Sequence, residues 1–346
     1  MGVDLGDLAV KNTISLDSLS GKIIAVDAFN VIYQFLASIR QEDGTPLQDF
    51  RGNVTAHLSG LFYRNTKLID NGIKPIYVFD GERARLKGKT MEARAKAKET
   101  AKKKWEAALA KGELKEAKKY AQATSRLTGD MIEESKELLG YMGIPWVQAK
   151  GEGEAQAAAM VHEGKAYAAA SQDYDCMLFG SPILIRNLSI TGRRKVPRQD
   201  RFVMVEPEEI KLNETLQSLD ITREQLIVMG ILTGTDFNEG VYRVGPKTAL
   251  KIVKEHKSLS EVKKYVKEKY DYEFEVDPED VFKIFMKPEI AKTKEKFKWG
   301  NVSASKIEKL LVERHDFSED RVERTTNQII KSFEEKGKQK NLGQWF

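Results

Sequence analysis

Four acidic residues stand in two closely spaced pairs, each just after a short apolar run that is predicted to be a strand. The pairs are Glu152 with Glu154 and Asp173 with Asp175. Carboxylates packed this closely repel one another and take up protons unless a cation lies among them. Oxygen ligands at this density are typical of a hard divalent ion, so the pattern predicts a Mg²⁺ site.

Three further aspartates have a similar position in the sequence. Asp27 and Asp80 each end an apolar run, and Asp236 follows an apolar helix. Any one of them, taken alone, is more often a helix N-cap or a turn residue than a ligand. That explanation becomes improbable for seven carboxylates that share one kind of position. Two Mg²⁺ ions roughly 3.5–4 Å apart, as in nucleases and polymerases, would use this many oxygens.

Predicted strands and amphipathic helices alternate along most of the chain. This alternation is typical of an α/β fold with a mostly parallel central sheet flanked by helices. Ligands bind such sheets outside the carboxyl ends of the strands, which would bring the acids together. The predicted strands are 22–28, 74–81, 144–149, 166–170 and 183–188. The predicted helices are 30–40, 53–71, 131–142, 208–218, 223–232 and a charged series to about 331, and 192–201 is predicted to be a polar loop.

A basic segment interrupts this alternation. Residues 83–126 hold fifteen Lys or Arg and five Glu, a net charge of +10 that leaves −5 for the rest of the chain. Such a segment indicates a polyanion partner, although a solvated helical face is an equally common explanation. Lys87 and Arg94 are seven residues apart and share one helical face. Because they follow Asp80 closely, we expect them over the carboxylates, where they would stabilise charge developing on a phosphate.

Other chemistries find little support in the 346 residues. The four histidines do not have the spacing of a metal site. The single cysteine, Cys176, is not expected to act as a catalytic nucleophile, because no histidine lies near it in sequence and the carboxylates before it would raise the pKa of its thiol. No apolar run could span a membrane and no signal peptide opens the chain. The sequence therefore predicts a soluble intracellular protein.

Several short motifs resemble those of the flap endonucleases of the XPG nuclease family, and they span nearly the whole chain in the family's order. They are Met1-Gly2-Val3, Ala25-Val26-Asp27-Ala28, Ile32-Tyr33-Gln34-Phe35-Leu36, 71–81, Met142-Gly143-Ile144-Pro145, Gly151-Glu152-Gly153-Glu154-Ala155, Asp173-Tyr174-Asp175-Cys176 and Gly245-Pro246-Lys247. The chain looks most like an archaeal member.

The resemblance implies a PIN-like nuclease fold in a single domain over 1–330, with a helical arch at 83–130 and a helix–two-turn–helix DNA-binding element at 234–256. It implies a monomeric 5′ flap endonuclease that cuts branched DNA by two-metal-ion hydrolysis in Okazaki fragment processing and DNA repair. A metal-activated water would leave a 5′-phosphate and a 3′-hydroxyl, and 5′–3′ exonuclease activity would accompany the main one. The expected location is the archaeal cytoplasm, or the nucleus if the source is eukaryotic.

The resemblance also implies a role for individual residues. One Mg²⁺ would be held by Asp27, Asp80, Glu152 and Glu154, and the other by Asp173, Asp175 and Asp236 with help from Glu154; Mn²⁺ could replace Mg²⁺. Lys87, Arg94 and Asp175 are the expected catalytic residues. The expected DNA contacts are Tyr33, Thr55, Arg64, Arg243, Lys247, Phe317 and Arg321.

These DNA contacts have different expected roles. Tyr33 would stack on a base, although such a tyrosine taken alone is more often a core residue. Thr55, Phe317 and Arg321 resemble a pocket for a one-nucleotide 3′ flap, and Lys247 would contact a phosphate.

The helix–two-turn–helix motif departs from the family pattern. The family usually has Gly-x-Gly-Pro-Lys and a bound K⁺, whereas Arg243 stands at the first glycine and Gly240 stands where some members have a serine ligand. K⁺ would then depend on backbone carbonyls alone, and Arg243 could itself reach a phosphate.

The polar tail, residues 331–346, is expected to be flexible, and it ends in a second motif. Gln339, Leu342, Trp345 and Phe346 fit the pattern by which replication proteins bind the sliding clamp (PCNA). A short helical turn would bring the last three side chains together for a groove on the partner.

Two alternatives to a flap endonuclease remain open, one a different nuclease and the other a protein without enzymatic activity. A related 5′ exonuclease or a bubble-cutting repair nuclease would use the same acids. A DNA-junction binding protein or clamp adaptor without catalysis would have no use for seven carboxylates that repel one another.

Overall fold

The computed structural model describes residues 5–81, 88–195 and 201–342. The strands are β1 (Asn12–Thr13), β2 (Ile23–Asp27), β3 (Lys74–Phe79), β4 (Trp146–Gln148), β5 (Ala168–Ala170), β6 (Ile183–Arg186), β7 (Gly192–Lys195), β8 (Phe202–Val205) and β9 (Glu208–Lys211). The α-helices are α1 (Ala28–Ser38), α2 (Ala56–Asp70), α3 (Gly88–Ala110), α4 (Leu114–Gln122), α5 (Gly129–Tyr141), α6 (Gly153–His162), α7 (Asp175–Leu178), α8 (Leu212–Leu219), α9 (Arg223–Thr233), α10 (Pro246–Glu255), α11 (Leu259–Tyr270), α12 (Pro278–Met286), α13 (Ala304–Glu308) and α14 (Glu319–Leu342).

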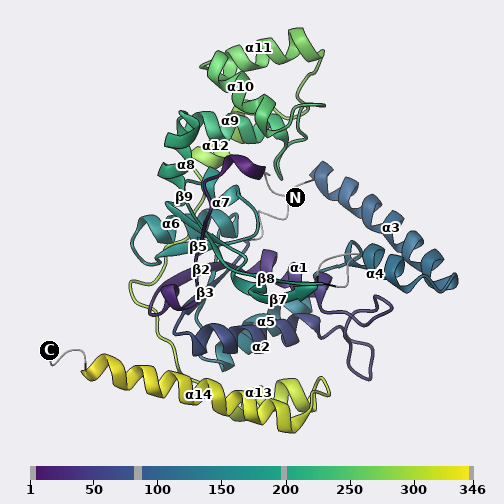
Figure 1. The fold of residues 1–346 in the computed structure, drawn as a ribbon, viewed down its shortest axis with the longest axis vertical. Coiled ribbons are helices and arrows are strands. Elements are labelled where there is room, and N and C mark those ends of the chain that lie inside the picture. The colour runs from purple at the N-terminus through teal and green to yellow at the C-terminus, as the bar shows by residue number, and fades with distance from the viewer. Residues whose placement is uncertain (1–4, 82–87, 196–200, 343–346) are drawn as a thin grey trace.

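One sheet of seven strands organises the chain, in the order β1-β9-β6-β5-β2-β3-β4. The five strands from β6 to β4 are parallel, and β9 and β1 add an antiparallel edge. The predicted fold class, α/β with a mostly parallel central sheet, is therefore confirmed (Figure 1).

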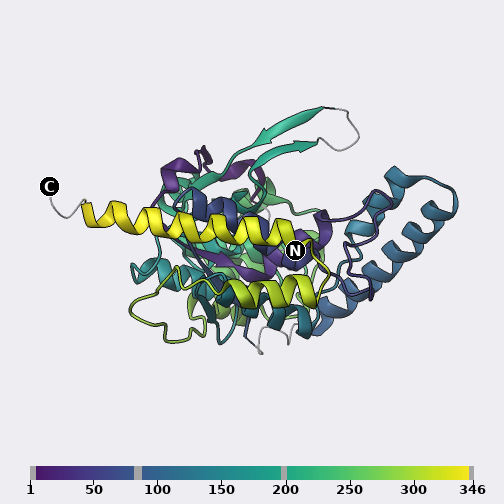
Figure 2. The same cartoon turned by 90° about the horizontal axis from the view of Figure 1, so that it is seen from below.

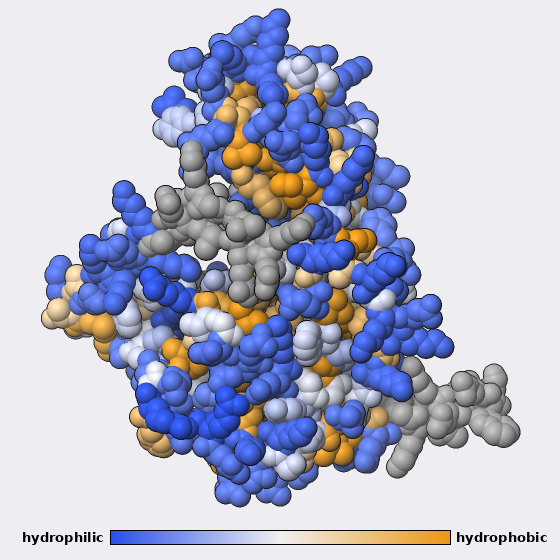
Figure 3. Space-filling model, turned by 180° about the vertical axis from the view of Figure 1, so that it is seen from behind, coloured by the Kyte–Doolittle hydropathy of each residue, from blue (hydrophilic) through white to orange (hydrophobic). Residues whose placement is uncertain are grey.

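Hydrophobic cores lie on both faces of this sheet. Along β2, Ala25 belongs to the core that contains α6, α7 and α9, whereas Ile24 and Val26 belong to the core that contains α1, α2 and α5. Strands buried on both faces are apolar throughout, which is why these runs could be found in the sequence. Seen from behind, the outer surface is mostly hydrophilic with small hydrophobic patches (Figure 3).

The basic segment forms a pair of packed helices, α3 and α4, that projects from the body of the molecule (Figures 1 and 2). Of the side chains that are described in this pair, few are buried, among them Ala108, Ala117 and Ala121. Trp105 ties the pair to the body by donating from Nε1 to the backbone oxygen of Asp43 at 3.1 Å. A helical arch was expected at residues 83–130, and the described part of this segment is largely helical.

Three expectations about secondary structure were wrong. The described start of the predicted polar loop at 192–201 is strand β7, which pairs antiparallel with β8, from Gly192 opposite Val205 to Lys195 opposite Phe202. The predicted helix at 208–218 begins as strand β9, which pairs with β6 before α8 starts. The helical series does not end near 331, since α14 continues to Leu342, and helical backbone therefore extends well into the segment expected to be a flexible tail.

Among the described residues, no helix is both long and apolar enough to cross a membrane.

Candidate active site

The carboxylates converge because their strands are parallel neighbours. Asp27 ends β2 and Asp80 follows β3, and these two strands pair directly. Glu152 follows β4, and Asp173 follows β5, which pairs with the other side of β2. Carboxyl ends of parallel strands meet at one edge of a sheet, so the acids gather there.

Ser171 links two of these acids. Its hydroxyl lies 3.3 Å from Asp27 Oδ2 and 3.1 Å from Glu154 Oε1. Asp27 also caps α1, where its Oδ1 accepts from the backbone N–H of Asn30 at 3.1 Å. The two carboxylates are thereby held close together from different elements of the fold.

Asn30 positions the loop that carries Asp173. Its side-chain nitrogen donates to Asp173 Oδ2 at 3.0 Å, and its side-chain oxygen accepts from the backbone N–H of Gln172 at 3.1 Å. One amide in the first turn of α1 therefore fixes both the carboxylate and its backbone.

Asp80 is fixed by the start of α6. The backbone N–H of Gly153 donates to Asp80 Oδ1 at 2.7 Å, a charge-assisted bond at a helix N-terminus. A Cβ at Gly153 would lie 2.7 Å from that oxygen, and a Cβ at Gly81 would lie 2.1 Å from the backbone oxygen of Lys150. Position 81 therefore needs glycine so that the two chain segments can approach, whereas a side chain at position 153 would press on the Asp80 carboxylate.

Burial and mutual repulsion govern the electrostatics of the cluster. The pKa of Asp27 is raised well above its usual value by burial and then by the charge of Asp80. The pKa of Glu154 is also raised well above its usual value, by burial and by the charge of Asp175. Burial likewise raises the pKa of Asp173. These carboxylates resist being charged together until a cation joins them.

Six of the seven predicted acids are connected by these charge interactions. Glu154 is affected by Asp27, Asp173, Asp175 and Asp236, and Asp27 is affected by Asp80. Glu152, the seventh, stands at the N-cap of α6, beside the glycine that binds Asp80. No three Asp, Glu, His or Cys side chains in the described ranges already have the spacing of a closed metal site.

The donor set fits a hard divalent cation. Every candidate ligand is a carboxylate, and the two most strongly perturbed, Asp27 and Glu154, would be relieved by added positive charge. The structure thus brings six of the seven predicted acids together, while the assignment of individual ligands stays a prediction.

Three residues that the sequence analysis missed support the cluster, namely Asn30, Ser171 and Arg186. Arg186, at the end of β6, donates to the backbone oxygen of Gln172 at 3.1 Å and to the hydroxyl of Tyr174 at 2.7 Å. A charged residue inside the predicted apolar strand 183–188 was the signal that could have identified it.

Cys176 lies next to the cluster and is buried, with Sγ 4.0 Å from Glu154 Oε1. Burial and the neighbouring carboxylates raise the pKa of its thiol well above the usual value. The expectation that the acids raise this pKa is confirmed, and the thiol is a poor nucleophile.

Tyr33 lies at the surface, although a tyrosine considered without its surroundings is more often a core residue. It is 39% exposed on α1, and Lys98 Nζ of α3 lies 5.3 Å from the centre of its ring. An exposed aromatic ring beside a basic helix is suited to stacking on a nucleic-acid base. Lys87 lies outside the described residues, and for Arg94 in α3 the structure describes the helical backbone and not the side chain.

The connection between α9 and α10 makes two consecutive turns. The backbone N–H of Thr235 donates to the oxygen of Asn238, and that of Val244 donates to the oxygen of Val241. Arg243 has a φ of 65°, the conformation that favours the glycine found in the family pattern. Lys247 is exposed at the start of α10. Arg243 and Lys247 are both exposed, and their contact with a phosphate stays a prediction.

Gly240 leaves no room for a serine side chain. A Cβ there would lie 2.4 Å from both the carbonyl carbon and the oxygen of Thr233. A hydroxyl ligand for a monovalent ion is therefore incompatible with this turn as it is folded.

The remaining predicted DNA contacts are distributed around α2 and α14. Arg64 and Arg321 are exposed, and the guanidinium of Arg321 lies 5.4 Å from the centre of the Tyr63 ring. Thr55 is buried at the N-cap of α2, and Phe317 is partly buried. The structure describes these four residues, and their role in DNA binding stays a prediction.

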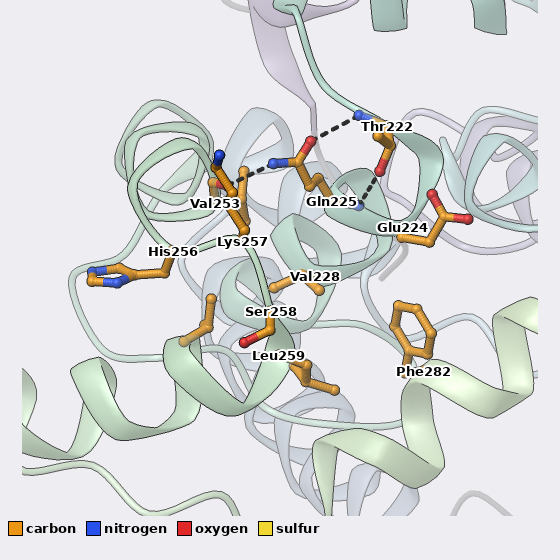
Figure 4. Close-up of a pocket in the computed structure, with 11 residues that line it drawn as sticks. Thr222, Glu224, Gln225, Val228, Val253, His256, Lys257, Ser258, Leu259 and Phe282 are labelled. Carbon is orange, nitrogen blue, oxygen red and sulfur yellow. Dashed lines mark hydrogen bonds between the residues drawn. The ribbon is translucent and has the colours of Figure 1, made fainter.

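A cavity of about 430 Å³ lies between α9, α10, α11 and α12 (Figure 4). Its walls include Val228, Val253 and Leu259, and none of the predicted site residues lines it. Gln225 spans one wall by donating to the backbone oxygen of Val253 at 2.7 Å. We interpret this cavity as a gap left by imperfect packing among α9, α10, α11 and α12.

The chain is similar to known proteins over its whole length. The family models for the XPG N-terminal domain and the XPG I-region match residues 5–101 and 143–236. Flap endonuclease 1 of Staphylothermus marinus is 48% identical and that of Aeropyrum pernix 49% identical, each covering 100% of both chains. The solved structure of flap endonuclease-1 from Methanococcus jannaschii is 38% identical, with a TM-score of 0.74 over 97% of this chain and 100% of that one.

Proposed function

The chain belongs to the flap endonuclease family and is a structure-specific 5′ nuclease that processes DNA, and we propose that it cuts branched DNA at the base of a single-stranded 5′ flap. The observation that carries this proposal is the gathering of acids at the carboxyl edge of the parallel sheet. Cutting flaps would give the protein a role in Okazaki fragment processing and in DNA repair.

The family is one of metal-dependent nucleases, and we propose two Mg²⁺ ions, replaceable by Mn²⁺, at this edge. One would be held by Asp27, Asp80, Glu152 and Glu154, and the other by Asp173, Asp175 and Asp236 with help from Glu154. When bound, such a pair activates water and stabilises the charge on the scissile phosphate.

The chain's own residues prepare the site for that chemistry. Ser171 and Asn30 hold three of the carboxylates in fixed positions, so little reorganisation is needed during the reaction. Burial keeps bulk water from screening the charges. Lys87 and Arg94, near the base of the α3 segment, are proposed to donate to the same phosphate.

The DNA is proposed to lie across several elements. The 5′ strand would pass beneath the arch formed by 83–130 and stack on Tyr33. The duplex arms would contact Arg64, the turn with Arg243 and Lys247, and the Thr55, Phe317 and Arg321 region, by their phosphates and without reading the sequence. A K⁺ ion at the turn would depend on backbone carbonyls alone, because Gly240 has no hydroxyl.

The sliding clamp (PCNA) is the proposed protein partner. Gln339, Leu342, Trp345 and Phe346 form the docking motif, at or beyond the end of α14. A monomer would suffice for all these contacts, as a single domain over 1–330 carries the site, the arch and the 234–256 element.

Three 5′-labelled DNAs of matched length, tested side by side in Mg²⁺, distinguish the alternatives. We expect strong preference for a double-flap junction over a nicked duplex and a bubble, with a product slightly longer than the flap. Equal cutting of the nick would indicate a 5′ exonuclease, and preference for the bubble would indicate a repair nuclease. Tight binding without cutting would favour a junction-binding clamp adaptor.

A further inference from the structure

The segment 287–303 joins α12 to α13 as a strap along one edge of the sheet, and it carries an unusual row of lysines. Residues 287–299 contain five Lys and two Glu. Ala291, Thr293, Phe297 and Trp299 are partly buried, whereas Lys292, Lys294, Lys296 and Lys298 between them are exposed. The strap therefore presents its lysines to solvent, whereas Ala291, Thr293, Phe297 and Trp299 lie partly against the protein.

Contacts made by the inward residues fix the path of the strap. Gln156 of α6 exchanges two hydrogen bonds with the backbone of Ala291, at 2.6 and 3.2 Å. Lys165 donates to the hydroxyl of Thr293 at 2.7 Å, and Trp299 donates from Nε1 to the backbone oxygen of Pro75 at 2.8 Å. The lysines thus stand on a rigid backbone.

The strap begins beside the candidate active site. The backbone N–H of Gln156 donates to the oxygen of Glu152, so the residue that holds Ala291 is one helical turn from a predicted metal ligand. A Cβ on Gly151 would lie 3.4 Å from the backbone oxygen of Glu289. From there the strap passes to Gly143 at the opposite end of the strands, on the flank away from α3 and α4 (Figures 1 and 2).

The charge of the row is not neutralised by the rest of the described chain. None of Lys292, Lys294, Lys296 and Lys298 makes an ion pair with a described residue, whereas Lys263, Lys267 and Lys283 of the neighbouring helices each pair with an acid. Glu295, at a bend in the strap, is the one acid inside the row. Uncompensated cations at alternate positions attract a polyanion strand.

We propose that this lysine row, Lys292, Lys294, Lys296 and Lys298, binds the phosphates of the single-stranded 5′ flap after it has crossed the carboxylates. The inference rests on the proposed function and deepens it. Because the strap begins next to Gly151 and lies on the flank away from α3 and α4, a strand that passed beneath the arch and over the carboxylates would leave toward it. The row is one residue wide, which suits a single strand, and the duplex arms have the other contacts described above.

The test compares binding of two double-flap DNAs, one with a flap of about two nucleotides and one with about twenty, in the absence of divalent ions. The variant changes all four lysines to alanine, and its matched control changes them to arginine. We expect the alanine variant to bind the long flap at least about tenfold more weakly, with a salt slope lower by about 3, because each single-strand phosphate contact contributes about 0.7. Its short-flap affinity and the long-flap affinity of the arginine control should match wild type.

Equal weakening for both flaps would overturn the proposal in favour of a duplex contact, and no weakening would overturn it outright. A defect seen only when the sliding clamp is added would show a protein partner instead. Cleavage of the short flap by wild type tests the proposed function separately, because the alanine variant should cut that DNA normally.

Discussion

Asn30 and Asp173 are joined across 143 residues of sequence by a 3.0 Å hydrogen bond from the side-chain nitrogen of Asn30 to Oδ2 of the aspartate. The same side chain accepts from the backbone N–H of Gln172, so α1 and the loop after β5 are held as one unit. Neither Asn30 nor Gln172 is an expected metal ligand. Their effect on the site is therefore through the position of Asp173.

Replacing Asn30 by leucine keeps a similar volume and removes both bonds. Loss of such an outer partner usually costs about 10–100-fold in metal affinity or activity, so cleavage at low Mg²⁺ should fall by this factor and recover in part at high Mg²⁺. Mn²⁺ binding followed by electron paramagnetic resonance should weaken in parallel. Ser38→Ala, on the far end of α1, is the control. Unchanged Mn²⁺ affinity in Asn30→Leu would show that the bond is only structural.

Asp175 is buried at the start of α7 and raises the pKa of Glu154 by its charge. Asp175→Ala should reduce cleavage by at least about a hundredfold and leave DNA binding largely intact. Because one of several repelling acids is removed, the variant should also melt at a higher temperature than wild type when divalent ions are absent. Glu255→Ala, at an exposed position, should change neither property. Near-normal turnover of Asp175→Ala in Mg²⁺ would contradict the two-metal assignment.

His315 connects two parts of the fold through both ring nitrogens. Nδ1 lies 3.1 Å from Asp49 Oδ2 and Nε2 lies 3.0 Å from Glu134 Oε1. The hydrogen bond to Glu134 raises the pKa of His315 above its usual value. Its stabilising effect is therefore complete below the unfolded pKa of about 6.5 and is lost as the pH rises through the raised folded value.

His315→Gln should lower the free energy of unfolding by about 2 kcal/mol near pH 6, and the difference from wild type should narrow as the pH rises. Chemical denaturation across this pH range measures it, with the exposed His162→Gln as control. Parallel stability curves for His315→Gln and wild type would exclude a charged His315.

Acid should also weaken the contacts of His315, because its two partners, Glu134 and Asp49, take up protons. Burial alone would raise the pKa of Glu134 and of Asp49, but hydrogen bonds, including those with His315, lower both to about 2. Their contribution to stability is present above the unfolded pKa of about 4 and is lost as the pH falls toward the folded value.

The sequence predicted the acids better than the residues that hold them. Asp27 and Asp80 could be placed because an apolar run that ends in a carboxylate has a definite position in a parallel sheet. Asn30 and Ser171 could not, since neutral polar residues in first turns and loops carry no comparable pattern. Their role depends on contacts between segments far apart in the chain.

The errors in secondary structure have a similar origin. Residues 208–211, Glu-Glu-Ile-Lys, have the composition of a helix, yet pairing with Ile183–Arg186 makes them a strand. Strand formation depends on such neighbours more than on intrinsic preference, and the neighbours are not visible in the local sequence.

Arg243 combines backbone strain with a proposed phosphate contact. At a φ of 65° a non-glycine residue costs roughly 1 kcal/mol, so Arg243→Gly should stabilise the fold by about that amount. The same change removes an exposed cation, so duplex affinity should fall and the salt slope should decrease by about 0.9. Lys247→Ala should lose affinity in the same way without gaining stability. Stabilisation of Arg243→Gly with unchanged DNA affinity would remove Arg243 from the DNA contacts.

The clamp motif can be tested apart from the nuclease site, because it begins near the end of α14 and none of the predicted carboxylate ligands belongs to that helix. Deleting residues 339–346 should leave cleavage of a double flap unchanged when no clamp is present. The same deletion should abolish the stimulation of cleavage by added sliding clamp, because the apolar anchor for the clamp's groove is gone. The matched variant keeps the full tail and changes Trp345→Ala and Phe346→Ala. It should lose clamp stimulation as the deletion does, because the aromatic pair and not the length of the tail provides the anchor. Stimulation that survives in both variants would mean that the clamp is held elsewhere on the surface, whereas stimulation lost only on deletion would assign the contact to the residues before the aromatic pair.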